Sequence, residues 1–202
     1  MNVLIVYAHD EPSSFTAAMK NVALEALGNQ GHQVVVSDLY GQGFNPVSQK
    51  WDFVATTGGH YNYMLEQRHA ARLDMAFSPD ILGEIQKLRA AELVLFAAPI
   101  WWLSVPAIMK GWFDRVLAMG VAWDGGHLHD KGLMRGRQAM LICAAGGPHE
   151  YYTEQGGYKT TTAQMLHSIN HGPLGLCGID VHEPCVAMNF FGLKKEKGAK
   201  LL

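Results

Sequence analysis

Short runs of apolar residues alternate along the chain with longer stretches in which apolar residues recur at helical spacing. The apolar runs fall at residues 2–8, 33–37, 93–98, 138–144 and 179–187. This alternation is typical of a parallel β-sheet that carries helices on both faces. The last run contains Pro184, which favours a position near the edge of the sheet. The pattern therefore predicts an α/β fold built on a five-stranded parallel sheet.

Helices are expected over residues 15–28, 78–88, 105–117 and 162–169. Ser104 is the expected N-cap of the third helix, whose apolar surface exceeds what one face of a sheet needs. Pro173 is expected to end or kink the chain after the fourth. Residues 40–75 are weakly patterned and residues 125–136 are rich in glycine, which is typical of long surface excursions.

Composition indicates one domain over residues 1–202, because 49% hydrophobic residues can fill a sizeable core and no composition break divides the chain. The net charge is −2, without a basic stripe, which argues against nucleic acid as a partner. No apolar run is long enough for stable membrane insertion. Cys143, Cys177 and Cys185 form no CxxC pair and lie in apolar segments, which predicts buried, reduced thiols and a cytoplasmic location.

Three strand-to-helix junctions are expected at one edge of the sheet, since the carboxyl ends of parallel strands point the same way. The first, residues 7–16, ends in hydroxyl residues at a helix N-terminus, where free amides and the helix dipole favour a phosphate. The fingerprint GxGxxG is absent, which disfavours NAD bound in the Rossmann manner. The alternative is that Ser13 or Ser14 only caps the helix and that His9 is an ordinary loop residue.

The other two junctions carry aromatic and glycine residues. Trp101 and Trp102 could form the apolar wall of a site for a planar heterocycle, or they could simply seal the core. Gly146 and Gly147 leave backbone amides open to a ligand, although a plain turn also uses this pair. The convergence of all three junctions favours a ligand site.

Residues 98–116, APIWWLSVPAIMKGWFDRV, resemble the NAD(P)H:quinone oxidoreductase family of the DT-diaphorase type. Shorter matches extend the resemblance from residue 1 to about residue 190, at residues 7–9, 14–15, 78–81, 146–147, 177–179 and 183–184. The resemblance implies a flavodoxin-like fold, a homodimer, and a ping-pong transfer of hydride from NAD(P)H through the flavin to a quinone. It implies FAD, with FMN as the alternative because the chain stops soon after residues 190–192, where the family continues into parts of the adenine site.

The resemblance also assigns residues to the flavin. On the phosphate side it places His9, Ser14, Phe15 and Thr16. Along the isoalloxazine ring and its pyrimidine edge it places Pro99, Ile100, Trp101, Trp102, Leu103, Ala144, Ala145, Gly146 and Gly147. It places Trp123 and Val121 in the substrate pocket, and His127 is either solvent-exposed or part of that pocket.

Two tyrosines are the candidate catalytic residues. Tyr152 resembles the family's tyrosine beside the flavin carbonyl, and Tyr158 occupies the position of the family's catalytic histidine. A tyrosine can donate a hydrogen bond to developing negative charge, but it cannot readily deliver a proton at neutral pH as histidine does.

Other functions have weaker support in the sequence. His167 and His171 stand four residues apart on a helix, but no HExxH pattern accompanies them, so no metal site is expected. No GxSxG motif suggests a hydrolase. The rival functions are a flavin-binding regulatory subunit of a membrane transporter, and an azo- or nitro-reductase of the same mechanism. Residues 194–200, rich in lysine, are expected to be a solvated tail.

Overall fold

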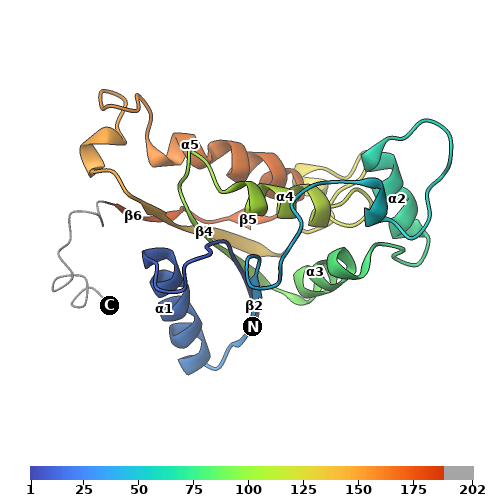
Figure 1. Ribbon diagram of the computed structural model, residues 1–202, viewed down its shortest axis with the longest axis horizontal. Coiled ribbons are helices and arrows are strands. Elements are labelled where there is room, and N and C mark those ends of the chain that lie inside the picture. Colours follow the sequence, from blue (N-terminus) through green and yellow to red (C-terminus); the bar gives the residue numbers. More distant parts are fainter. Residues whose placement is uncertain (189–202) are drawn as a thin grey trace.

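The structure, a computed structural model, describes residues 1–188, so the expectations for residues 190–192 and 194–200 lie outside the described residues. Its strands are β1 (Asn2–Tyr7), β2 (Gln33–Asp38), β3 (Leu93–Pro99), β4 (Gln138–Ala145), β5 (Asp180–Val181) and β6 (Cys185–Met188). Its α-helices are α1 (Phe15–Asn29), α2 (Tyr63–Arg72), α3 (Pro79–Ala90), α4 (Ala107–Val116) and α5 (Thr162–Ile169). These elements form a flavodoxin-like α/β fold (Figure 1).

The strands pair in parallel in the order β2-β1-β3-β4-β5, and β6 also pairs with β4. β5 pairs with the first residues of β4 and β6 with the last, so the single strand expected over residues 179–187 is split into two short ones. Pro184 lies between them, where its missing N–H cannot join a ladder. Within residues 1–188, six strands therefore stand where five were expected, and the expected edge position is confirmed.

Alternate residues of the strands face two separate cores. Leu4 and Val6 of β1 belong to the larger cluster, which includes residues of α3, α4 and α5. Val3 and Ile5 point to the opposite face and pack with residues of α1. Figure 1 shows α1 on one side of the sheet and α3, α4 and α5 on the other. The expectation of helices on both faces is confirmed.

Two expectations for the third helix are wrong. Ser104 is not its cap, because α4 begins at Ala107 after Pro106, and Ser104 instead closes a turn with Trp101. The apolar surplus of this helix is buried in the core of the chain itself, where Met109 and Trp112 are fully buried. That surface therefore gives no support to a dimer.

The local signals at the other helices give a mixed result. Ser14 caps α1 by accepting a hydrogen bond from the amide of Ala17 at 3.1 Å. α5 is followed by a π-helix, Asn170–Leu174, that contains Pro173 and is kinked, which confirms the expected interruption. α2 lies inside the excursion that was expected to be irregular, and Asn62 caps it by accepting from the amide of Leu65. An asparagine three residues before that leucine was the local signal that could have indicated α2.

The cysteines are free, as expected, but they are not all buried. Burial raises the pKa of Cys143 and of Cys177 to about 12. Cys185 is exposed, because it lies on the short edge strand β6. Within residues 1–188, no helix combines the length and apolar character that crossing a membrane requires.

Candidate functional site

The strand register brings the three expected junctions to one rim of the sheet. Tyr7 at the end of β1 pairs with Ala97 of β3, and Pro99 at the end of β3 pairs with Ala144 of β4. The backbone continues this contact past the strands, since the amide of Ile100 donates to the carbonyl of Ala144 at 2.8 Å. The loops that follow β1, β3 and β4 therefore start side by side, which confirms the expected convergence.

The loop after β1 is fixed by its own polar groups. The carboxylate of Glu11 accepts from both the amide and the hydroxyl of Ser13, at 2.7 and 2.6 Å. The Ser13 hydroxyl is the main reason that the pKa of Glu11 is lowered. The ring of His9 lies edge-on to that of Trp101, with centroids 6.0 Å apart, so the first two loops touch. Thr16, in the first turn of α1, is buried.

The loop after β3 is a tight turn with a strained backbone. Trp101 and Ser104 exchange two backbone hydrogen bonds, of 2.9 and 3.1 Å, around Trp102 and Leu103. Both central residues have positive φ, 51° and 61°, which is the geometry of a type I′ turn and is uncommon without glycine or asparagine. The turn holds the Trp102 side chain 99% exposed. This turn costs backbone strain and leaves an apolar ring exposed to solvent. The combination indicates a binding surface rather than core packing.

The loop after β4 brings the two candidate catalytic tyrosines together. The amide of Gly147 donates to the Tyr152 hydroxyl at 3.3 Å, and a Cβ on Gly147 would lie 3.1 Å from that oxygen. The ring of Tyr158 lies 5.1 Å from that of Tyr152, centroid to centroid. Burial is the main cause of the raised pKa of Tyr152, so this hydroxyl keeps its proton at neutral pH.

A cavity of about 290 Å³ joins the second and third loops. It is lined by Ile100, Trp102, Leu103, Tyr152 and Tyr158. Pro99, Ala144 and Ala145, at the ends of β3 and β4, have buried side chains, so these three can contribute only backbone groups to a ligand.

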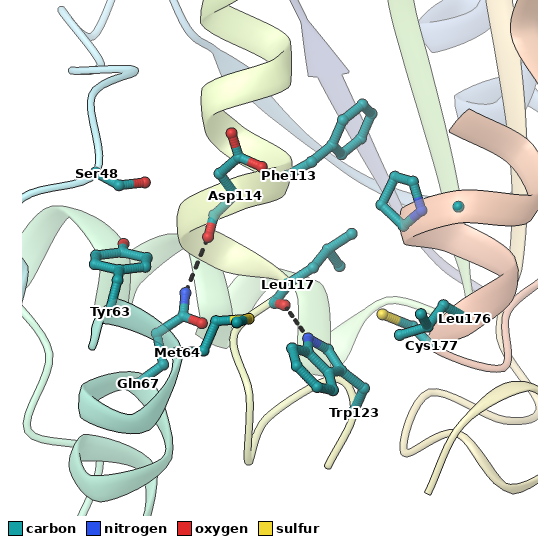
Figure 2. A pocket seen from close by; sticks show the side chains of 12 residues that line it. Ser48, Tyr63, Met64, Gln67, Phe113, Asp114, Leu117, Trp123, Leu176 and Cys177 are labelled. Carbon is teal, nitrogen blue, oxygen red and sulfur yellow. Dashed lines mark hydrogen bonds between the residues drawn. The ribbon is translucent and has the colours of Figure 1, made fainter. Parts of the chain in front are cut away.

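The predicted substrate residues lie elsewhere in the chain. Trp123 lines a second cavity of about 330 Å³ with Tyr63, Phe113 and Leu176, and its indole nitrogen donates to the carbonyl of Leu117 at 3.0 Å (Figure 2). Val121 is buried in the core and His127 is exposed in a turn. The two cavities share no lining residue, so one copy of the chain does not bring Trp123 to Tyr152.

A buried ion pair anchors the wall of the second cavity. Arg115 donates from Nη2 to Oδ1 of Asp52 at 2.8 Å and from Nε to Oδ2 at 3.1 Å, and both side chains are almost fully buried. Tyr63 donates its hydroxyl to the same carboxylate at 2.7 Å, and burial together with this bond raises its pKa. Gln67 donates to the carbonyl of Asp114 at 2.9 Å, which ties α2 to α4 (Figure 2). Sequence reasoning missed this network, because its members are far apart along the chain.

His167 lies on α5 and His171 in the π-helix that follows it. The rings of His167 and His171 lie 4.3 Å apart, centroid to centroid, and both residues are exposed. Within residues 1–188, no cluster of three histidine, cysteine or acidic side chains that could hold a metal ion occurs.

Comparisons with known proteins agree with this architecture. A family described as having the flavodoxin-like fold matches residues 1–201. Ribosyldihydronicotinamide dehydrogenase (quinone) of Homo sapiens is 42% identical over 187 residues, which cover 92% of this chain and 80% of the human one. NAD(P)H dehydrogenase (quinone) 1 of Rattus norvegicus is 40% identical over 183 residues, which cover 90% of this chain and 66% of the rat one.

A solved structure leads to the same family. The crystal structure of a candidate quinone reductase from Klebsiella pneumoniae has a TM-score of 0.91 and 36% identity, and the match covers 100% of this chain and 80% of that one. Because sequence and structure both match over nearly the full chain, the protein belongs to the flavodoxin-like fold family, in the group that contains the quinone dehydrogenases.

Proposed function

We propose that this chain is a flavin-dependent oxidoreductase that transfers two electrons from NAD(P)H to a quinone or a similar small aromatic acceptor. The observation that carries the proposal is the strained turn that holds Trp102 exposed beside the cavity of Tyr152 and Tyr158. The printed names of the human and rat relatives, both quinone dehydrogenases, support the same class of reaction.

The residues at the rim fit a flavin. The cavity is walled by an indole and two phenol rings, and its volume of about 290 Å³ is close to the lower end for small-molecule sites. Gly147 lies so close to Tyr152 that any side chain there would meet the tyrosine hydroxyl. The ring would be held by Trp102, Leu103 and the backbone around Gly146, and the phosphate by the loop from His9 to the start of α1 (Ser14, Phe15 and Thr16).

When bound, the flavin would supply the redox chemistry, since it accepts hydride from a nicotinamide and returns it to an acceptor. The chain's own part is to place hydrogen-bond donors where negative charge develops. The Gly147 amide donates to the Tyr152 hydroxyl, and Tyr158 also interacts with this hydroxyl, so the two phenols form one polar pair at the wall of the cavity. Tyr158 adds a second phenol, without the neutral-pH proton exchange of a histidine.

The active form in this proposal is a homodimer. Trp123 can serve as a substrate residue only if a second copy brings it to the Tyr152 cavity, because the two cavities of one chain are separate. The cavity of Figure 2 is open and partly walled by Met64, which is 50% exposed, so this side of the chain offers apolar surface to a partner. A cytoplasmic location belongs to the same proposal, and three free thiols are consistent with it.

Purified protein tests the proposal directly. We expect a flavin absorption spectrum, FAD or FMN in the mass of the released chromophore, and steady oxidation of NADH or NADPH with a simple quinone and no added partner. A colourless protein that binds neither FAD nor FMN would contradict it. Bound flavin without quinone turnover would favour the transporter-subunit alternative, and faster turnover with azo or nitro compounds would favour that class of acceptor.

A further inference from the structure

Trp123 lies in a loop, residues 119–127, that is closed by backbone hydrogen bonds on both sides of the indole. The amide of Gly120 donates to the carbonyl of Trp123 at 2.7 Å, and the amide of His127 donates to the carbonyl of Asp124 at 2.8 Å. Gly120 has a φ of 85°, which residues with a side chain rarely adopt. The Trp123 loop therefore has a defined shape, and its position depends on the elements that hold it from outside.

Helix α2 holds the start of the Trp123 loop. The Oε1 atom of Gln67 accepts from the amide of Met119 at 3.2 Å, and Gln67 is almost fully buried. A Cβ on Gly120 would lie 2.9 Å from the Cβ of Ala71 and 3.3 Å from the Cα of Arg68, so the backbone of the loop lies directly against the helix. Gln67 also lines the second cavity (Figure 2). One helix therefore walls this cavity and supports the loop.

The last turns of α2 hold the middle of the Trp123 loop through charge. Arg68 and Arg72 are four residues apart, so they share one face of the helix, and they bracket the carboxylate of Asp124. The Nη1 atom of Arg68 lies 3.6 Å from Oδ1, and the Nη2 atom of Arg72 lies 3.6 Å from Oδ2. The amide of Gly125 also donates to Oδ1, at 2.8 Å, which fixes the direction of the carboxylate. Two positive charges of one helix thus hold the residue that follows Trp123.

We propose that Arg68 and Arg72 are positioning residues for the acceptor, acting through Asp124. The inference rests on the proposed function, in which Trp123 of one copy meets the Tyr152 cavity of the other. Asp124 directly follows Trp123, so a carboxylate held in place limits the movement of the indole. Without the two ion pairs the loop keeps its hydrogen bonds, but the indole would meet the acceptor in a wider range of orientations. Neither arginine touches the acceptor in this scheme.

Quinone titrations of the flavin-loaded protein test the proposal. In the double variant Arg68→Gln/Arg72→Gln we expect the KM for a simple quinone to rise about fivefold, with kcat within about twofold of wild type. Fivefold corresponds to about 1 kcal/mol, the upper range for partly exposed ion pairs. At 3.6 Å the contacts are ion pairs rather than hydrogen bonds, so Arg68→Lys/Arg72→Lys should keep nearly the wild-type KM. A glutamine variant with the wild-type KM, or a lysine variant that is equally impaired, would overturn the role.

Asp124→Asn distinguishes positioning from direct contact with a substrate. Asparagine keeps the oxygen that accepts from Gly125 but removes the charge. If the arginines position the loop, this variant should raise the quinone KM about as much as the double glutamine variant, and combining the three changes should add nothing. If the guanidinium groups instead bound the phosphates of NAD(P)H, Asp124→Asn would free them and lower the KM for NAD(P)H. That result would overturn the positioning role.

Lys110→Gln is the matched control. Lys110 forms an exposed ion pair with Asp114 at 2.6 Å, but both residues belong to α4, so this pair joins no loop to a helix. We expect the variant to keep the wild-type KM and kcat. A similar rise in the quinone KM would show that the loss of any surface ion pair has this effect, and it would contradict a specific role for Arg68 and Arg72.

A spectroscopic measurement tests the positioning without turnover. The chain has five tryptophans, and in protein labelled with 5-fluorotryptophan the variant Trp123→Phe identifies the ¹⁹F resonance of Trp123. In Arg68→Gln/Arg72→Gln we expect this resonance to shift or broaden while the other four stay unchanged. An unchanged Trp123 resonance, or equal changes in all five, would overturn the role. If the wild type binds no flavin, the proposed function fails, and the ¹⁹F spectrum still decides whether the arginines hold the indole.

Discussion

Trp102→Ala is expected to separate cofactor binding from folding. The Trp102 side chain is 99% exposed, so its removal takes nothing from the core. Alanine at the same φ of 51° keeps the strain of the turn, whereas glycine would relieve it. The unfolding free energy of the stripped protein should therefore stay within about 0.5 kcal/mol of wild type.

The expected loss of binding follows from the area that a stacked ring would cover. An aromatic side chain buries ~150–250 Å² in full, so one face of the indole corresponds to roughly 100 Å². At about 25 cal/mol per Å², this area is worth about 2.5 kcal/mol, or roughly 70-fold in flavin affinity. Quenching of flavin fluorescence during titration measures the affinity, and urea unfolding measures the stability.

Trp51→Ala is the control for Trp102→Ala. Trp51 is also strongly exposed, at 82%, but it lies in the 3-10 turn Lys50–Asp52 of the excursion rather than at the rim. We expect its flavin affinity to match that of the wild type. The reasoning is refuted if Trp102→Ala binds flavin within twofold of wild type, or if the stripped variant loses more than about 1 kcal/mol of stability.

Four further outcomes are expected. Tyr152→Phe should slow flavin reduction about 100-fold with flavin still bound, because a donor to developing charge is lost; unchanged stopped-flow kinetics would remove Tyr152 from the mechanism. Tyr158→His introduces a group that titrates near pH 6.5, so the turnover rate should vary between pH 5 and 8 more steeply than in wild type, and identical profiles would show that this position does not reach the reaction. Arg115→Met leaves the buried carboxylate of Asp52 with the Tyr63 hydroxyl but without its positively charged partner, and this should cost about 3–5 kcal/mol in urea unfolding. Adding Asp52→Asn should restore part of the loss, and a loss below about 1 kcal/mol would mean that the ion pair is dispensable. Burial alone would raise the pKa of Asp80, but the Ser78 hydroxyl and Arg115 outweigh burial and the pKa is lowered. The stability that ionised Asp80 contributes is therefore complete above about pH 4 and lost as the pH falls below that. Asp80→Asn should flatten the fall of the urea midpoint between pH 5 and 3, and an unchanged slope would show that this carboxylate does not contribute to the pH dependence of stability.

The sheet, most of the helices and the position of the rim can be predicted from the amino-acid pattern alone. The apolar runs predict five strand positions at nearly the observed residues, and only the break at Pro184 divides the last of them. Ser14 and Pro173 act on the backbone within a few residues of themselves, so their effects are visible in the sequence. The three rim loops were predictable for the same reason, because parallel strands that follow one another through helices must end on the same side.

Which side chains are exposed, buried or paired at the rim depends on the folded chain. The positive φ at Trp102 depends on a turn whose residue types do not favour it, and the burial of Val121 depends on neighbours from other elements. The separation of Trp123 from Tyr152 is a relation between side chains distant in sequence. Hydrophobic period and capping are local properties, whereas burial, pairing and the shape of a cavity are set by segments that meet only when the chain has folded.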